Sequence, residues 1–136
     1  MNTVFFVNSG SEANDLALRL ANTHTRARGV LTLEHAYHGH VSSIIDISPY
    51  KFLGKGGRGR PDHVRVVPIP DAYKGRHRGP GAGAAYAGEF ATAFADLGQP
   101  LAAFISEAIV STAGQVTLAD GFLPLAYQAT REAGGV

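Results

Sequence analysis

The 136-residue sequence has no cysteine, no long apolar run and almost no net charge, and each absence excludes a class of protein. Without cysteine there is no disulfide bond, which fits a reducing compartment such as the cytoplasm. A membrane span needs about 20 consecutive apolar residues, so we expect no insertion into a bilayer. The formal net charge of +1 gives no overall attraction to nucleic acid or to a membrane surface.

What the sequence contains is the composition of one globular domain, with 45% hydrophobic and 17% charged residues. Met1 leads almost directly into the apolar residues 4–7, without the basic and longer apolar stretches of a signal peptide. At the other end, Gly134 and Gly135 are typical of a helix stop, and Val136 reads as the start of another strand. We therefore expect a piece of a larger domain.

The most informative segment is 4–14. Residues 4–7 predict a buried strand, and apolar side chains then recur at helical spacing (Ala13, Leu16, Ala17, Leu20 and Ala21). Between them, Ser9–Gly10–Ser11 forms a turn at a helix N-terminus, where unpaired N–H groups and the helix dipole favour a phosphate. Gly10 allows close approach, and the hydroxyls of Ser9 and Ser11 add donors. The alternative is that Ser9 or Ser11 merely caps the helix. The P-loop and dinucleotide patterns are missing, which disfavours a nucleotide.

Strands and helices alternate along the rest of the chain. Further strands are predicted at 30–33, 64–68 and 101–110, and helices at 41–47, 86–97 and 121–133, with Gly29 as a helix stop. This order predicts an α/β layer fold around a largely parallel sheet. Ligands bind such sheets at the carboxyl ends of the strands, where several polar residues of this sequence lie.

Tyr37, His38 and Gly39 follow one predicted strand, and Glu107 lies within the apolar run of another. An aromatic face, an imidazole and close backbone access suit a planar heteroaromatic ligand. A surface loop is the simpler alternative for the first group, and a carboxylate reaching solvent is the alternative for Glu107. A metal held by the histidines of this loop is disfavoured by their close spacing and the lack of cysteine.

Positive charge concentrates in two loops, 51–60 and 74–78 (Lys51, Lys55, Arg58, Arg60, Lys74, Arg76 and Arg78). The first loop resembles an RNA-binding Gly/Arg tract in composition, but it is short, and Phe52 is the one aromatic residue interleaved with its cations. We favour a solvated surface loop, with attraction of an anionic substrate as a second interpretation.

Together these motifs resemble the class III (ornithine- and 4-aminobutyrate-type) pyridoxal-phosphate aminotransferases over nearly the whole chain. The resemblance rests on residues 8–14, on 36–39, on Ser106–Glu107 with Gly114, and on 121–123. Residues 37–40 and 48–52, with Gln115, are similar to the ethanolamine-phosphate and phosphohydroxylysine phospho-lyase branch.

The resemblance implies the large domain of a fold-type I enzyme, with three α/β/α layers and a mostly parallel sheet. It assigns the phosphate of pyridoxal 5'-phosphate to Gly10 and Ser11 and the stacking position on its ring to Tyr37. Ser9, His38 and Glu107 are further residues of that site, and no metal is implied. It also implies a small-molecule amino substrate, handled by transamination or phospho-lyase elimination, and a homodimeric parent. From the charge and the lack of a long apolar run we expect no nucleic acid or membrane partner.

Two groups that perform the family's chemistry have no counterpart here. An aspartate pairs with the pyridine nitrogen, and a lysine forms the Schiff base. The aspartate is expected on the strand after 121–133 and the lysine beyond it, whereas Lys51, Lys55 and Lys74 all precede Glu107. We therefore expect residues 1–136 to be an inactive fragment of the cofactor-binding domain, without the N-terminal segment, the Schiff-base lysine region and the C-terminal domain.

Two substitutions also depart from the family's pattern. Ala108 replaces a proline, and Thr112 stands where many aminotransferases carry a second glutamate, which argues against ordinary transaminase substrate handling. Two other functions remain open from the sequence: a non-catalytic module that binds a phosphate or cofactor, and an RNA-binding fragment that acts through the basic glycine-rich loop.

Overall fold

The computed structural model describes residues 2–136, and its centre is a sheet of three parallel strands. The strands β1 (Gly29–Leu33), β2 (Val64–Val67) and β3 (Leu101–Ile105) lie in the order β2-β1-β3. The predicted strand at 30–33 is confirmed, and all five residues of β1 are buried, as in a strand that is covered on both faces.

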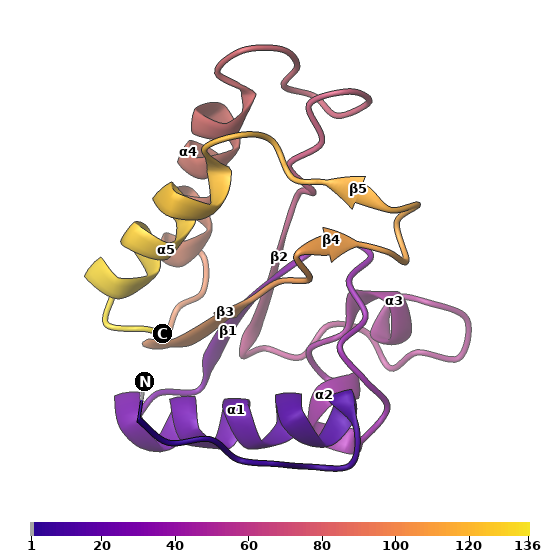
Figure 1. The fold of residues 1–136 in the computed structure, drawn as a ribbon, viewed down its shortest axis with the longest axis vertical. Helices are drawn as coiled ribbons and strands as arrows, with labels where there is room; N and C mark the ends of the chain where they lie inside the picture. Colours follow the sequence, from indigo (N-terminus) through magenta and orange to yellow (C-terminus); the bar gives the residue numbers. More distant parts are fainter. Residues whose placement is uncertain (1) are drawn as a thin grey trace.

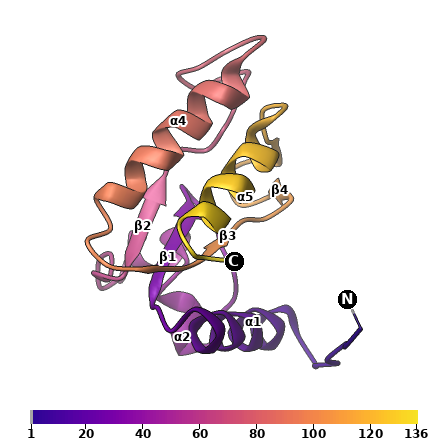
Figure 2. The same ribbon diagram turned by 90° about the vertical axis from the view of Figure 1, so that its left-hand side faces the viewer.

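Helices cover both faces of this sheet, which confirms the predicted three-layer α/β/α arrangement. One layer contains the first two helices and the other contains the last two, while a short third helix follows the second (Figures 1 and 2). Their bounds are α1 (Gly10–Thr25), α2 (Ser42–Ile45), α3 (Pro49–Phe52), α4 (Ala82–Ala95) and α5 (Phe122–Glu132).

Alternate residues of the central strand enter separate cores. Leu31 and Leu33 join the core beneath α4 and α5, whereas Val30 joins the smaller core beneath α2 and α3. In the larger core, Phe90 of α4 lies edge-on to Phe104 of β3 and to Phe122 of α5, with ring centroids 4.7 and 5.9 Å apart. These contacts fix both helices to the sheet.

The structure contradicts the strand predicted for residues 4–7. This segment is extended without strand pairing and leads away from the body of the molecule (Figure 2). Val4 is 73% exposed and Phe6 is 94% exposed. A strand exists only where a neighbour completes its hydrogen bonds, and no strand of residues 2–136 lies beside this segment.

The predicted strand 101–110 is in fact two strands. β3 ends at Ile105, and Ile109–Val110 forms β4, which pairs antiparallel with β5 (Val116–Thr117) in a separate small sheet. The break lies at Ser106 and Glu107, whose polar side chains bond to the backbone of nearby loops. After α5, the N–H of Val136 donates to the Ala102 carbonyl and its carbonyl accepts from the N–H of Phe104, both in β3, as expected for the start of another strand.

Gly29 is not the predicted helix stop. Arg26 ends α1 in the left-handed conformation, with φ 54°, and Gly29 is the first residue of β1. A Cβ at Gly29 would lie 2.5 Å from Leu97 Cδ2 and 2.7 Å from the carbonyl oxygen of Pro100. The glycine is therefore required by close packing in the sheet. The predicted helix 86–97 also begins earlier, at Ala82.

Candidate functional site

The first turn of α1 combines a helix cap with unused hydrogen-bond donors. Ser9 Oγ accepts from the N–H of Glu12 at 3.2 Å, and the Glu12 carboxylate accepts from the N–H of Asn8 at 2.7 Å. Ser9 is thus the capping residue, as in the simpler of the two interpretations. Within residues 2–136, the N–H groups of Gly10 and Ser11 have no partner, so they are available to an anion.

The loop after β1 is fastened onto this turn. Ser11 Oγ accepts from the N–H of His40 at 3.2 Å, and Asn14 donates to the His38 carbonyl at 2.7 Å. Gly39 lies so close that a Cβ would be 2.6 Å from Ser11 Oγ, and its φ is +138°. The structure therefore brings Ser11 and the predicted Tyr37–Gly39 cluster together across 28 residues of sequence.

His38 is part of the buried support of this loop. The ring Nε2 lies 2.9 Å from Thr32 Oγ1, and the backbone N–H donates to Ser48 Oγ at 3.0 Å. The side chain is buried. Burial lowers the pKa of His38 to about 4, with the nearby Glu107 carboxylate acting in the opposite direction. The imidazole is therefore neutral at physiological pH and positions the loop.

We expect this neutral imidazole to make the protein sensitive to acid. Between about pH 6.5 and 4 the unfolded chain protonates His38 while the folded chain does not, so stability falls as pH falls through that range. The loss approaches about 3 kcal/mol near pH 4. Urea unfolding at several pH values measures it. His38→Gln should flatten this pH dependence, whereas the control His24→Gln, on the exposed surface of α1, should leave it unchanged.

Glu107 joins the ends of β1 and β3. One carboxylate oxygen accepts from the N–H of Tyr37 at 3.1 Å, and the other accepts from the N–H and hydroxyl of Ser111 at 3.1 and 2.9 Å. Thr112 adds a second link by donating to the carbonyl oxygen of His35. The half-buried Tyr37 is thus held at its backbone, and Glu107 is a bonded support, not a carboxylate free in solvent.

The sequence analysis assigned no role to three residues that support this site: Asn14, Thr32 and Ser48. Asn14 and Ser48 lie within the family motifs, and Asn14 also shares a helix face with Ser11. Thr32 had no signal, because the sequence does not show which buried polar side chain meets a buried histidine.

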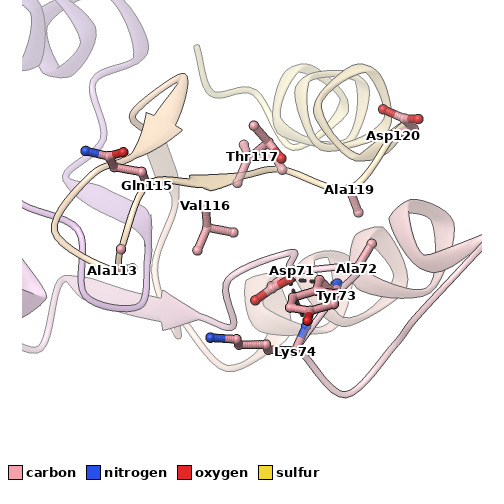
Figure 3. A pocket seen from close by; sticks show the side chains of 12 residues that line it. Asp71, Ala72, Tyr73, Lys74, Ala113, Gln115, Val116, Thr117, Ala119 and Asp120 are labelled. Carbon is pink, nitrogen blue, oxygen red and sulfur yellow. Dashed lines mark hydrogen bonds between the residues drawn. The ribbon is translucent and has the colours of Figure 1, made fainter.

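A cavity of about 630 Å³ lies farther along the chain, between the loop 71–74 and the segment 113–120. Figure 3 shows Tyr73 and Lys74 on one side of it and Gln115 and Thr117 on the other. The Asp71 carboxylate accepts from the N–H groups of Tyr73 and Lys74 at 2.7 and 3.0 Å, which closes the loop into a tight turn.

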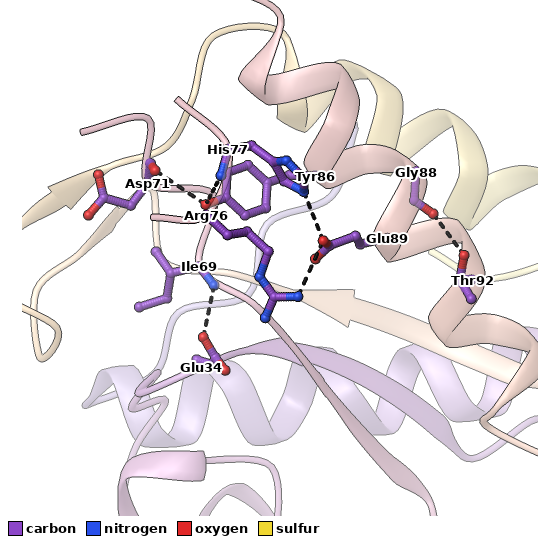
Figure 4. A network of polar contacts seen from close by, with 9 residues as sticks. All are labelled: Glu34, Ile69, Asp71, Arg76, His77, Tyr86, Gly88, Glu89 and Thr92. Carbon is purple, nitrogen blue, oxygen red and sulfur yellow. Dashed lines mark hydrogen bonds and ion pairs between the residues drawn. The ribbon is translucent and has the colours of Figure 1, made fainter. Parts of the chain in front are cut away.

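A polar network fixes this loop to α4 (Figure 4). Glu89 accepts from Arg76 at 3.3 Å and lies 2.8 Å from His77 Nε2, while the Tyr86 hydroxyl donates to the Asp71 carbonyl and accepts from the His77 N–H. Of the cations in the second basic loop, Arg76 is thus explained by attachment of the loop to a helix.

The described residues contain no group of three or more histidine, aspartate or glutamate side chains placed to hold a metal ion. His38 faces Thr32 and His40 faces Ser11, so the histidines of the loop after β1 diverge. None of the helices in residues 2–136 has the length and hydrophobicity of a membrane span.

The three-layer α/β/α fold, with polar loops at one helix N-terminus and at the ends of parallel strands, is that of the fold-type I class. The aminotransferase class-III family matches residues 1–135, and the chain belongs to that family. Enzymes of this family use pyridoxal phosphate.

Individual relatives support this membership. The chain is 48% identical over 144 residues to "Alanine--glyoxylate aminotransferase 2-like" of Drosophila melanogaster, which covers 100% of this chain and 29% of the relative. It is 53% identical over 78 residues to "Ethanolamine-phosphate phospho-lyase homolog 1" of Caenorhabditis elegans, covering 57% of this chain and 17% of the relative.

Among solved structures, a phospholyase from Arthrobacter, in complex with phosphoethanolamine, has a TM-score of 0.83 and 33% identity, covering 97% of this chain and 32% of that protein. The 136 residues thus span less than a third of the length of each of these relatives.

Proposed function

We propose that this chain forms the part of a class III enzyme that binds the phosphate and ring of pyridoxal phosphate. Gly10 and Ser11 would hold the phosphate through their N–H groups, and Tyr37 would stack on the ring. The observation that carries the proposal is the attachment of the loop 37–40 to the first turn of α1, where the N–H groups of Gly10 and Ser11 have no partner within residues 2–136.

The residues present fit this cofactor. No atom lies within 4 Å of a Cβ built on Gly10, so a phosphate can approach the backbone there. Pyridoxal phosphate, when bound, supplies an electron sink for bonds beside the amino group of the substrate. In this chain, Ser9 caps α1, while His38 and Glu107 hold the loop that carries Tyr37.

Within the family we propose the phospho-lyase reaction, on a small amine that carries a phosphate ester. The motif at residues 48–52 and the 33% identity to the Arthrobacter phospholyase support this choice. Thr112 supports it as well, because its hydroxyl is bonded to the His35 carbonyl instead of presenting a carboxylate.

We also propose that residues 1–136 are part of the cofactor-binding large domain and do not turn over substrate by themselves. The lysines present are Lys51, Lys55 and Lys74, in segments unlike that of the family's Schiff-base lysine. Borohydride treatment with the cofactor should therefore attach it to no single lysine, and specific labelling of one would contradict this. A homodimeric parent enzyme in the cytoplasm belongs to the same proposal.

Replacing Gly10 tests the phosphate assignment. Gly10 is the first residue of α1, and Ser9 before it is extended, with φ −156° and ψ 161°, so proline fits there. Gly10→Pro removes one donor and should weaken binding of pyridoxal phosphate roughly tenfold or more, since hydrogen bonds to charged groups contribute about 1.5–3 kcal/mol. Fluorescence titration measures the affinity.

Two controls accompany this variant. Gly10→Ala keeps the N–H but adds a methyl group. If alanine weakens the binding of pyridoxal phosphate less than proline does, the difference is due to the lost N–H donor and not to steric hindrance of the phosphate. Pyridoxal, which lacks the phosphate, should bind the wild-type chain and Gly10→Pro equally. Equal affinity of the wild-type chain and Gly10→Pro for pyridoxal phosphate would remove Gly10 from the site.

A further inference from the structure

A second cavity, of about 500 Å³, lies beside the candidate site and carries a strong excess of positive charge. It is bounded by α2, α3 and the glycine-rich loop that follows α3. Its lining contains four cations and one carboxylate, namely Lys51, Lys55, Arg58, Arg60 and Asp46. Such a concentration of positive charge favours an anion.

The glycine-rich loop is folded to bring these cations together. Gly59 donates to the carbonyl of Phe52 at 3.0 Å, and a Cβ on Gly57 would lie 2.2 Å from that same oxygen. Only glycine at 57 permits this approach to the end of α3. The loop thus returns over α3 and places Lys55 and Arg58 in the cavity that Lys51 also lines.

Most of these cations have no internal partner. Within residues 2–136, the ion pairs all involve Glu89, with Arg76 and with His77. Lys51, Lys55 and Arg58 therefore have no carboxylate within 4 Å, and Arg60 donates to the carbonyl of Val64. Clustered like charges repel each other, and a bound dianion relieves that repulsion.

Lys51 connects this cavity to the candidate cofactor site. Its ammonium lies 5.5 Å from the ring centroid of Tyr37 and 5.4 Å from that of Tyr50, and the two rings meet edge to face. Cation–π attraction holds the ammonium at this position. Tyr37 is in turn fixed through its N–H to Glu107. One side chain thus faces both the predicted ring-stacking residue and the basic cavity.

We infer that Lys51, with Lys55 and Arg58, binds the phosphate ester of the amine substrate and so determines specificity for phosphorylated substrates. This inference rests on the proposed function, because it places the substrate next to Tyr37. It makes the cavity a second phosphate site, separate from the donors at Gly10 and Ser11 that receive the phosphate of the cofactor.

The test measures binding of O-phosphoethanolamine to the 136-residue chain by NMR titration, with ethanolamine as the ligand that lacks phosphate. Lys51→Gln should weaken phosphoethanolamine binding about tenfold or more, as expected for loss of one charge-assisted hydrogen bond. Lys51→Arg should recover part of the affinity. The matched control Lys74→Gln changes an exposed lysine of the other basic loop and should have no effect.

The outcomes separate this inference from the proposed function. If pyridoxal phosphate binds and depends on Gly10 but Lys51→Gln leaves phosphoethanolamine binding unchanged, the inference is wrong and the proposed function stands. Absence of saturable binding at millimolar phosphoethanolamine also overturns it. If phosphoethanolamine binding depends on Lys51 while pyridoxal phosphate does not bind, the proposed function is wrong and the phosphate site at Lys51 stands. Tighter, Lys51-dependent binding of a short single-stranded RNA would overturn the inference in favour of an RNA site.

Discussion

Gly39→Ala is expected to lower the free energy of unfolding by roughly 3–5 kcal/mol, because it combines backbone strain with a steric clash between the new Cβ and Ser11 that no side-chain rotation relieves. The φ of +138° lies in a region that side chains disfavour, and the new Cβ would lie 2.9 Å from the Cα of Ser11. That Cα belongs to the first turn of a 16-residue helix and cannot move alone. Thermal and urea unfolding measure the loss, and the affinity for pyridoxal phosphate should fall with it.

The control for this variant is Gly79→Ala. Gly79 also has a positive φ, +70°, but no atom lies within 4 Å of a Cβ built there. It should lose only the cost of the left-handed conformation, about 1–2 kcal/mol. Equal losses for the two variants would show that contact with Ser11 is not what restricts position 39.

Gly83→Ala is the second substitution with a large expected effect, again roughly 3–5 kcal/mol of stability. Gly83 lies buried in the first turn of α4, against the segment that leads into α5. A Cβ there would lie 2.0 Å from the carbonyl oxygen of Asp120 and 2.8 Å from the N–H nitrogen of Phe122. Relief requires the two helices to separate, which opens the aromatic core around Phe90.

The same helix offers a matched control. Gly88 is exposed on α4, near Glu89 and Thr92 (Figure 4), and no atom lies within 4 Å of a Cβ built on it. Gly88→Ala should raise the free energy of unfolding by about 0.5–1 kcal/mol, because alanine favours a helix interior. Urea unfolding should therefore show opposite signs for the two variants. A stabilising Gly83→Ala would contradict the close contact between the helices.

Local patterns predicted most of the helices and strands. The short, mainly apolar segment of β1, the helical spacing in α1 and α5 and the alternation of elements led to the three-layer fold, because each of these signals is carried by neighbouring residues. The predictions failed where a distant partner decides. Residues 4–7 form no strand without a neighbour, and Glu107 interrupts an apolar run because its oxygens are needed by Tyr37 and Ser111.

In the candidate site, too, locally encoded features could be predicted and those set by distant residues could not. The turn at Ser9–Ser11 could be predicted as an anion site because a helix N-terminus always presents unpaired N–H groups. Which serine is the cap could not, since either hydroxyl can reach the backbone. The role of Gly39 was equally hidden, because its requirement comes from Ser11, 28 positions earlier in the chain.

By itself, the sequence determined the class of fold and the family, because short-range periodicity and motif order encode them, and it located the turn that we propose binds the phosphate. Only the tertiary structure decided that Ser9 caps α1, that Gly39 locks the Tyr37 loop to Ser11, and that Lys51 faces Tyr37 above a basic cavity. Those arrangements depend on distances between residues far apart in the chain, and distances of that kind are fixed only by packing.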